Sequence, residues 1–542
     1  MKEQVLRLVK SYQGLLILLI FINIVIGLIW VTDFGISIDE TEVYEAAFHR
    51  FKAYRTGSVP EDFFILNKYS HGAGYYVVGK VISEVFERIF VNWTMFDQWH
   101  FTHFLFFQLG GVFIFMLANK MVSGWASLGA VILFFYQPVL WGHAFINPKD
   151  TPFMTLMLGA LVLGIYAGDQ LPAWMSNQHN DKAVPENNSK TRIIKIMHQL
   201  ASILQIRWFL PTAVLLALCS STRVYGLFVW VAIGIYWVFK AGKKAIIPWI
   251  SLLIISGLLG FALWPDLWSA PKENYLAFWS NVFSFSGWNG KILFAGDIYN
   301  KTNYPRSFLP VLLSLKFTEP LMILFLIGLI GAIIWVVQKR ADWVLFSLLA
   351  IWFFGPILLA VIFHPTIYNN IRHFLFILPP IFIFAAIGLE ILIQSLKGKY
   401  WRLILPILVA LPGIFTIIQL HPMEYIYFNR IAGGVEGAFR EYELDYWRTS
   451  YREAAELINS WAPHGAAVGI YLNFDLIEDF LRDDFSTRFV RGDNLGNLEY
   501  LIISTNLNYD QELEALLPQI RKVDQVERYG VPLTVIYEVL EE

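Results

Sequence analysis

Long apolar runs, separated by short polar connections, dominate the chain from its N-terminus to residue 420. A run of about twenty apolar residues is long enough to cross a bilayer as a helix. The pattern predicts a polytopic α-helical membrane protein with about eleven transmembrane helices. The predicted spans are 13–31, 100–120, 124–141, 151–168, 207–222, 224–240, 245–264, 308–337, 342–363, 374–395 and 401–420.

Basic residues gather in every second connection between these runs, which sets the predicted orientation. The positive-inside rule assigns such connections to the cytoplasm, and it places the N-terminus there as well. An odd number of spans then puts residues 421–542 on the outer face of the plasma (inner) membrane. The basic connections contain Lys2, Arg7, Lys10, Lys190, Arg192, Lys195, Lys240, Lys243, Lys244, Lys339, Arg340, Lys397, Lys399 and Arg402.

The predicted outer face carries loops 32–99, 142–150 and 265–307 and the C-terminal tail. Val43, Ala47, Phe51 and Tyr54 recur at helical spacing, which predicts amphipathic helix lying on the membrane surface in the first loop. We therefore divide the chain into a transmembrane domain, 1–420, and a small soluble α/β extracytoplasmic domain, 421–542. In the tail, strand-like runs occur at 467–472, 499–504 and 532–539, and helical patterns at 450–461 and 509–521.

Composition agrees with this division and narrows the class of protein. The 542 residues are 56% hydrophobic and 15% charged, too few polar residues for a soluble protein of this size. The net charge of -2 argues against nucleic acid as a partner. Cys219 is the only cysteine, so an intrachain disulfide is excluded.

An acidic pair, Asp39 and Glu40, follows the first span. Two capping boxes fit the local sequence, Ser37 with Glu40 and Asp39 with Glu42, so helix capping alone explains the pair. The functional interpretation is that Asp39 or Glu40 acts as a general base that deprotonates an acceptor hydroxyl. The two interpretations are compatible, because one carboxylate can cap while its neighbour faces a cavity.

A second polar segment, His143 to Asp150, lies between two later spans on the same predicted face. Asp150 at a helix start is favoured by the helix dipole, which explains a lone acid there. Lys149 and His143 beside it make the segment a stronger candidate for a site. If both segments emerge on one face of the membrane, their carboxylates belong to one polar site, which a ligand enters from the lipid bilayer.

Basic residues on the predicted outer face run against the positive-inside rule. They suggest a site for an anion such as the phosphate of a lipid carrier, which needs several cationic donors. Lys316 and Glu319, three residues apart inside an apolar run, form either a structural ion pair or part of this site. The candidate phosphate-binding residues are Lys149, Arg223, Lys291, Arg306, Arg372 and His373.

His71, His143 and Tyr304 are further site candidates, although an interfacial histidine with a backbone partner explains His71 equally well. No metal-ligand spacing occurs, so the sequence names no metal ligands, and a divalent metal stays open as a cofactor. The chain also contains no Gly-rich phosphate loop and no HExxH motif.

Taken together, the motifs resemble family 39 of the C-type membrane glycosyltransferases, in its bacterial form. That family includes protein O-mannosyltransferases and the aminoarabinose transferase that modifies lipid A. The resemblance covers most of the chain. It rests on Asp39-Glu40, Asn147-Pro148-Lys149-Asp150, Thr318-Glu319-Pro320, the segment 372–380, the segment 421–429 and Leu444-Asp445-Tyr446-Trp447.

The resemblance implies catalysis on the outer face with a polyprenyl-phosphate sugar as donor. It matches Asp39 or Glu40 to the family's catalytic base and Asp150 to a second acid of the active site. It places Arg372 and His373 near that site. The expected reaction moves the sugar to a hydroxyl of a lipid, glycan or protein, by displacement with inversion.

Two other functions fit the same charges. A transporter or flippase of a lipid-linked or anionic solute would use them for passage, although no repeated halves occur in the sequence. A non-catalytic membrane assembly protein would need nothing special at Asp39, Glu40 or Asp150. The arrangement of these residues in space distinguishes the three.

Overall fold

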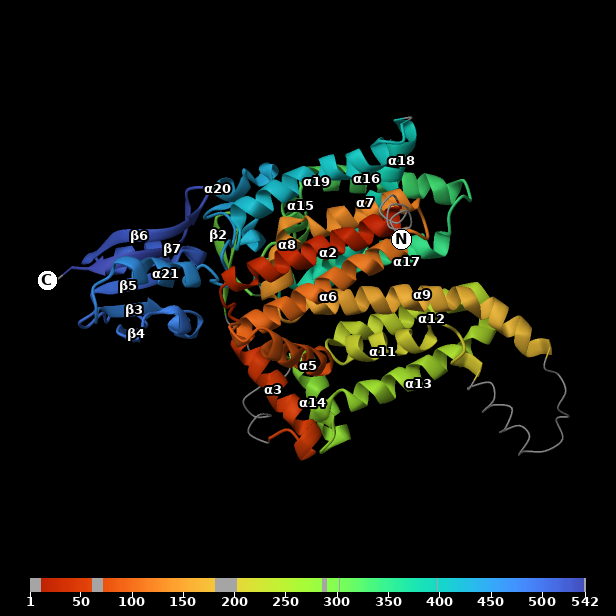
Figure 1. Ribbon diagram of the computed structural model, residues 1–542, viewed down its shortest axis with the longest axis horizontal. Coiled ribbons are helices and arrows are strands. Elements are labelled where there is room, and N and C mark those ends of the chain that lie inside the picture. Colours follow the sequence, from red (N-terminus) through yellow and green to blue (C-terminus); the bar gives the residue numbers. More distant parts are fainter. Residues whose placement is uncertain are drawn as a thin grey trace.

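Helices that run lengthwise form most of the molecule, and a small sheet lies beyond one of their ends (Figure 1). The computed structural model describes residues 11–60, 72–180, 202–284, 290–301, 303–396 and 398–540. Within this part, seven helical stretches are long and apolar enough to cross a membrane. They contain α2 (Tyr12–Trp30), α6 (Met95–Ala118), α9 (Asp150–Asn180), α12 (Leu227–Ala241) with α13 (Ile246–Ala262), α16 (Glu319–Val337), α17 (Trp343–Phe363) and α19 (Trp401–Leu420).

The count of about eleven spans is higher than the seven found here, or eight if one bent pair is a single span. That pair is α7 (Gly124–Phe135) and α8 (Pro138–Ile146), which meet at an angle of 64°. The run 308–337 divides into α15 (Phe308–Leu315) and α16. Two further predicted spans are short, α11 (Phe209–Ser220) and α18 (Pro379–Ser395), the second preceded by the 3₁₀ turn η5 (Arg372–Ile377).

Proline explains most of these breaks. Pro138, Pro320 and Pro379 each lie in the first turn of the second helix. A proline there lacks the N–H that would continue the preceding helix. Because proline interrupts the helix without interrupting the apolar run, a count of hydrophobic residues overlooks it.

Close backbone contact joins two of the helices in the interior. A Cβ atom at Gly328 of α16 would lie 1.6 Å from the carbonyl oxygen of Phe384 in α18. One at Gly388 of α18 would lie 2.3 Å from the carbonyl oxygen of Leu324. Small residues that let backbones approach are typical of helix pairs in membranes.

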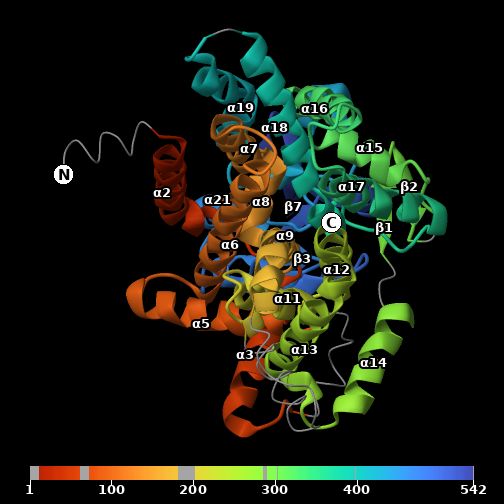
Figure 2. The ribbon, with the colours of Figure 1, turned by 90° about the vertical axis from the view of Figure 1, so that its right-hand side faces the viewer.

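Three helices outside the lengthwise bundle lie near its sheet end (Figures 1 and 2). The predicted surface helix corresponds to α3 (Glu40–Thr56), in which Val43 and Ala47 are buried. The Tyr54 hydroxyl donates to the carbonyl oxygen of Ala262 at 2.8 Å, which ties α3 to the end of α13. The others are α5 (Gly74–Ile89) and α14 (Pro271–Ser284), and a hairpin of β1 (Lys291–Phe294) and β2 (Asp297–Asn300) follows.

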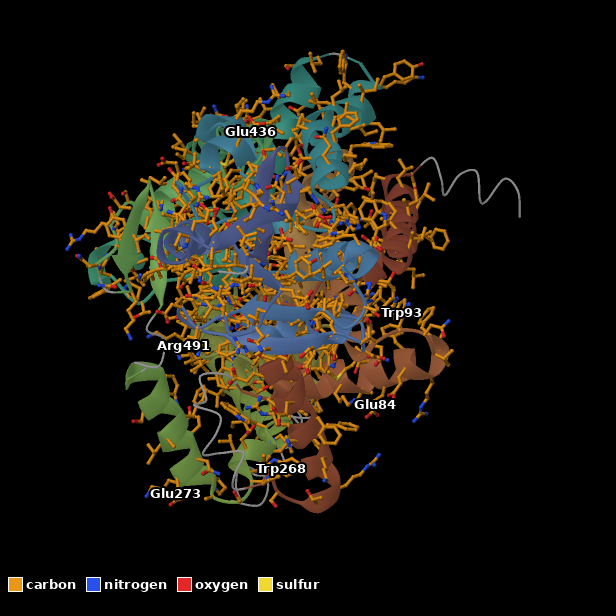
Figure 3. The ribbon with its side chains drawn as sticks, turned by 90° about the vertical axis from the view of Figure 1, so that its left-hand side faces the viewer. Glu84, Trp93, Trp268, Glu273, Glu436 and Arg491 are labelled. Carbon is orange, nitrogen blue, oxygen red and sulfur yellow. The ribbon has the colours of Figure 1, made fainter. Side chains whose placement is uncertain are left out.

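The C-terminal part contains a five-stranded sheet in the order β4-β3-β5-β7-β6. Strand β3 is parallel to β4 and β5, and β7 is antiparallel to β5 and β6. Figure 3 views the molecule from this end, with Arg491 and Glu436 labelled. The elements are α20 (Gly434–Ala438), α21 (Tyr451–Trp461), β3 (Ala467–Tyr471), β4 (Ser486–Val490), β5 (Tyr500–Ser504), α22 (Tyr509–Leu516), β6 (Ile520–Arg528) and β7 (Val531–Val539).

Strands β3, β5 and β7 lie where the sequence predicted strands. The helix expected at 509–521 ends at Leu516 because β6 begins at Ile520. Strand β4 was not predicted: it lies at the edge of the sheet and most of its residues are not buried, so it lacks an apolar signal. The other unpredicted strand of this sheet, β6, is also an edge strand.

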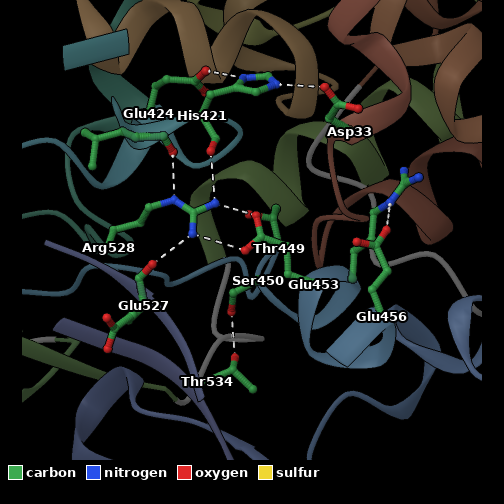
Figure 4. Close-up of polar contacts among 12 residues, drawn as sticks. Asp33, His421, Glu424, Thr449, Ser450, Glu453, Glu456, Glu527, Arg528 and Thr534 are labelled. Carbon is green, nitrogen blue, oxygen red and sulfur yellow. Dashed lines mark hydrogen bonds and ion pairs between the residues drawn. The ribbon is translucent and has the colours of Figure 1, made fainter. Parts of the chain in front are cut away.

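A polar cluster around His421, at the end of α19, connects the sheet to the helical bundle (Figure 4). Its imidazole lies between two carboxylates, with Nδ1 2.8 Å from Glu424 and Nε2 3.0 Å from Asp33. Arg528 of β6 donates to the carbonyl oxygen of His421 at 2.9 Å and pairs with Glu453 of α21. The first span, the last span and the sheet therefore meet at this cluster.

Candidate active site

Asp39 lies in the turn before α3, at the end of the helical bundle that faces the sheet. It occupies the N-cap position, yet its side chain caps no backbone N–H. Instead, Lys149 Nζ lies 3.1 Å from Oδ2, and Arg372 donates to the same oxygen. The side chain is 17% exposed. Asp39 is thus a partly accessible carboxylate held by two cations from distant segments.

Glu40 has a different environment from its neighbour. Its carboxylate is fully buried and accepts hydrogen bonds from the Ser37 N–H at 2.5 Å and the Tyr44 hydroxyl at 2.7 Å. His100 Nε2 lies 2.6 Å from Oε1. The Ser37 bond is one half of a capping box. Of the two capping interpretations, the one through Ser37 and Glu40 applies, and Asp39 is left to face the cations.

Asp150 begins α9 and pairs with Arg223, whose guanidinium lies 2.5 Å from Oδ1. Asn147 caps this helix start, because its Oδ1 accepts the backbone N–H of Asp150 at 2.8 Å and that of Lys149 at 3.2 Å. The first loop is joined to this segment by the Ser37 hydroxyl, which donates to the carbonyl oxygen of Ile146 at 2.9 Å.

Arg372 completes the group from η5. Its guanidinium lies between two aromatic rings, 5.1 Å from the centroid of Tyr368 and 5.3 Å from that of Trp447. His373 follows it, with its ring 4.5 Å from that of Tyr368. The five charged groups at the centre come from four distant parts of the chain and are Asp39, Lys149, Asp150, Arg223 and Arg372.

The charges in this group do not balance. Burial opposes ionisation of Asp39, but Arg372 and Lys149 outweigh it and hold the pKa of that carboxyl well below its usual range. Burial, together with Arg372 and Arg223, lowers the pKa of Lys149, which Asp39 and Asp150 offset in part. Three cations face two carboxylates, so the group has room for one more negative charge.

Three polar atoms of the group are buried without a hydrogen-bond partner among the described residues. They are Asp150 Oδ2, Arg223 Nε and Arg372 Nε. Buried polar atoms normally have partners, and unpaired ones at a charged site call for a ligand or ordered water. Their position on both sides of the group indicates a site built for a polar molecule.

An apolar pocket of about 540 Å³ lies beside Arg223. Ser221 and Val224, which flank that arginine closely in sequence, line it. Its walls come from α12, α13 and α14. They include Trp230, Gly260, Trp264, Tyr275 and Trp279.

Residues that follow the last span also reach the site. In the sequence, this segment contributed only to the family resemblance. Burial raises the pKa of Glu443 to about 8, although Arg372 lowers it in part. Burial also raises the pKa of Asp445 to about 6, against hydrogen bonds from Ser450 and Tyr425. One signal in the sequence could have identified these two acids as site residues. They lie among apolar residues, next to the aromatic residues Tyr446 and Trp447.

Several predicted site residues lie elsewhere. Lys291 is half exposed and lies 3.7 Å from Glu512 of the C-terminal part, and Arg306 is exposed. Tyr304 donates to the carbonyl oxygen of Pro365, and its ring centroid lies 4.0 Å from that of His364, with the two rings tilted by 31°. Residues on one face of a membrane can still be far apart, which explains these misplacements. His71 lies outside the described residues.

His143 and the Lys316–Glu319 pair also differ from the simplest expectation. His143 is buried and bonds Asn147 and Tyr446 instead of contacting the charges. Lys316 Nζ donates to the carbonyl oxygen of Tyr425 at 3.3 Å, and Glu319 accepts the backbone N–H of Arg430. Lys316 and Glu319 therefore do not form the ion pair considered from the sequence.

No cluster of three or more His, Cys, Asp or Glu side chains that would suit a metal ion occurs within the described ranges.

No protein-family model and no curated protein sequence matches the chain. Among solved structures, ArnT from Cupriavidus metallidurans in the apo state aligns with 96% of this chain and 97% of its own, at 11% identity and a TM-score of 0.48. The same protein bound to undecaprenyl phosphate aligns over 97% and 98%, at 12% identity and 0.47. The Archaeoglobus fulgidus oligosaccharyltransferase aligns over 90% and 67%, at 9% identity and 0.39.

These neighbours are membrane glycosyltransferases of the C type, the group that the sequence motifs resemble. Their TM-scores lie below 0.5. The function is therefore inferred from the residues of the chain itself.

Proposed function

We propose that the chain is a membrane glycosyltransferase that moves a sugar from a polyprenyl-phosphate donor to a hydroxyl acceptor on the outer face of the membrane. One observation carries the proposal: Asp39 and Asp150, with Lys149, Arg223 and Arg372, form one buried group with an unmatched positive charge. The phosphate of the donor supplies the missing negative charge, and Arg and Lys are well suited to bind phosphate.

The two parts of the donor suit two neighbouring places, the charged group and the apolar pocket beside it. Its phosphate lies among Lys149, Arg223 and Arg372. Its polyprenyl chain lies in the apolar pocket next to Arg223, which is lined by tryptophans and helix α13. A lipid that approaches from the bilayer thus places its sugar near Asp39.

Asp39 is the base in this proposal because it is the accessible member of the acidic pair. It takes the proton of the acceptor hydroxyl as the hydroxyl oxygen forms its bond to the anomeric carbon. The bond from that carbon to the phosphate oxygen breaks, and the electron pair leaves with the lipid phosphate. Attack opposite the leaving group inverts the anomeric centre, and the proton passes from Asp39 to water.

Binding of the donor makes Asp39 a better base. Lys149 and Arg372 keep its pKa well below the usual range in the free protein. When an anionic phosphate draws these cations to itself, their hold on the carboxylate weakens and its affinity for a proton increases. The carboxylate is therefore ionised before the donor arrives and basic once it is bound.

The test is turnover by purified protein in lipid nanodiscs, with undecaprenyl-phosphate sugars and a membrane extract as acceptor. General-base help is worth roughly 10²–10⁴-fold, so Asp39→Asn should lower kcat by at least about 10²-fold. The variant also leaves Lys149 and Arg372 without their carboxylate and should unfold at a lower temperature, so kcat is measured on folded protein below its unfolding midpoint. Glu42→Gln is the matched control, because Glu42 is exposed on the same helix turn. Wild-type turnover in Asp39→Asn would contradict the assignment.

A transporter gives a different result in the same nanodiscs. It would move a labelled lipid between leaflets without forming a new glycosidic bond. Covalent transfer to the acceptor that depends on Asp39 is the outcome that supports an enzyme.

A further inference from the structure

A line of buried hydrogen bonds leads from the segment after the last span to the start of α9. The Tyr446 hydroxyl lies 3.1 Å from His143 Nε2, and His143 Nδ1 lies 3.1 Å from Asn147 Nδ2. Asn147 Oδ1 in turn holds the backbone N–H groups of Lys149 and Asp150. Tyr446, His143 and Asn147 are all buried. The line therefore ends at the two residues that carry opposite charges in the site.

The direction of each hydrogen bond follows from the last one. Because Asn147 Oδ1 accepts two backbone N–H groups, its Nδ2 is the donor toward His143. His143 Nδ1 must then accept, so the ring is neutral and carries its proton on Nε2. Nε2 donates to the Tyr446 oxygen, and the phenolic proton of Tyr446 points away from His143. Only one arrangement of protons satisfies the whole line.

The two ends of the line lie in parts of the protein that contact each other closely. Helix α8 carries His143, and a Cβ at Gly142 would lie 2.6 Å from the backbone nitrogen of Tyr425. The ring of His143 lies 5.0 Å from that of Trp447, the ring that also covers Arg372. The segment around Tyr446 therefore contacts Arg372 through Trp447 and the start of α9 through His143.

We infer that Tyr446 and His143 are positioning residues for glycosyl transfer. They hold Asn147 so that Lys149 faces the donor phosphate and Asp150 stays with Arg223. The segment that follows the last span is therefore needed to hold the donor site in the geometry that binds the donor. The inference rests on the proposed function and deepens it, because it assigns part of the site's geometry to residues that do not touch the donor.

The experiment compares Tyr446→Phe with Tyr451→Phe. Tyr451 is also a fully buried tyrosine of the C-terminal part, and its hydroxyl donates to the Tyr471 carbonyl oxygen at 3.1 Å, away from the site. Loss of a supporting hydrogen bond behind a ligand-binding group typically costs about 10–100-fold. We expect Tyr446→Phe to raise the Kd for undecaprenyl phosphate by about tenfold with an unchanged unfolding midpoint, and Tyr451→Phe to keep the wild-type Kd.

A double-mutant cycle separates a positioning role from a merely structural one. Once His143→Phe has kept the ring but removed both of its nitrogens from the line, Tyr446→Phe should add no further loss of affinity. Additive losses, or equal Kd values for Tyr446→Phe and wild type, would overturn the inference. If Tyr446→Phe does not fold, His143→Phe alone must weaken undecaprenyl phosphate binding, and wild-type binding by that variant would overturn it equally.

Binding is measured without turnover, so failure of this inference differs from failure of the proposed function. Undecaprenyl phosphate carries no sugar to transfer, so all Kd values are measured with Asp39 in place. If the wild-type protein binds undecaprenyl phosphate but transfers no sugar, the proposed enzymatic function is contradicted. The effect of Tyr446→Phe on the Kd can still be measured in that case.

Discussion

At the scale of single residues, the acidic pair after the first span divides into two roles. Asp39 faces two cations, whereas Glu40 is fully buried and accepts from Ser37, Tyr44 and His100. Adjacent carboxylates in one turn point in different directions, so a motif that names both does not distinguish them. The partners His100 and Tyr44 separate the roles, and neither belongs to the motif.

Glu40→Gln tests this division by its effect on stability. The amide replaces one accepting oxygen with a donor, and at least one of the three buried groups then loses its acceptor. Leaving a buried polar group unpaired costs about 1–3 kcal/mol, so we expect a lower unfolding midpoint. The measurement is thermal unfolding in detergent beside Glu42→Gln, which changes an exposed side chain of the same turn and should unfold like wild type. A Glu40→Gln protein that is fully stable yet inactive would assign the base to Glu40.

At the scale of elements, the first loop and the segment after the last span are in direct contact. A Cβ at Gly35 would lie 2.1 Å from the carbonyl oxygen of Thr449, a backbone atom that cannot move aside cheaply. We expect Gly35→Ala to destabilise the protein by about 1–3 kcal/mol and to expose the C-terminal part to protease. Gly257→Ala in α13 is the control, because its Cβ meets nothing within 4 Å. Equal resistance of both variants would show that this contact does not hold the sheet.

The cluster around His421 predicts how pH affects the same junction. Burial alone would lower the pKa of His421, but Glu424 and Asp33 outweigh it and raise the pKa above its ordinary value. A raised pKa in the folded state stabilises the protein fully below the ordinary histidine value, and that stabilisation is lost as pH rises through the raised value. Arg528 of the sheet binds the His421 carbonyl oxygen and pairs with Glu453, so the histidine lies at the junction between the last span and the sheet.

We therefore expect the unfolding midpoint of wild type to fall relative to His421→Gln as the pH increases from 5 to 9. The glutamine does not titrate, so the difference between the two curves isolates the histidine. Parallel curves over this range would mean that His421 carries no proton between its two carboxylates.

At the scale of the whole molecule, the sequence predicted the membrane class and the convergence of the central charges, but not the detailed path of the chain. Long apolar runs are a strong signal, which is why α2, α6, α9, α16, α17 and α19 lie where expected. Breaks at Pro138, Pro320 and Pro379 were missed because the hydrophobic signal continues through them. The predicted orientation of the termini stays a prediction.

Position on the predicted outer face was an uneven guide to the site, because Arg223 was chosen on that ground and does reach the charged group, whereas other residues chosen in the same way do not. Lys291 and Arg306 were chosen only because they lie on the predicted outer face, and both lie at the surface away from the charged group. Residues within the quoted motifs, among them Asp39, Lys149, Asp150 and Arg372, do converge. Distances between loops depend on how helices pack, which a list of spans does not contain.

The most direct test of the central claim is a cryo-EM structure of the protein in nanodiscs with undecaprenyl phosphate. We expect density for the phosphate within hydrogen-bond distance of at least two of Lys149, Arg223 and Arg372, with the polyprenyl chain in the pocket lined by Trp230 and Trp264. A phosphate bound on the opposite side of the bilayer, or a charged group that stays closed while the lipid binds elsewhere, would contradict it.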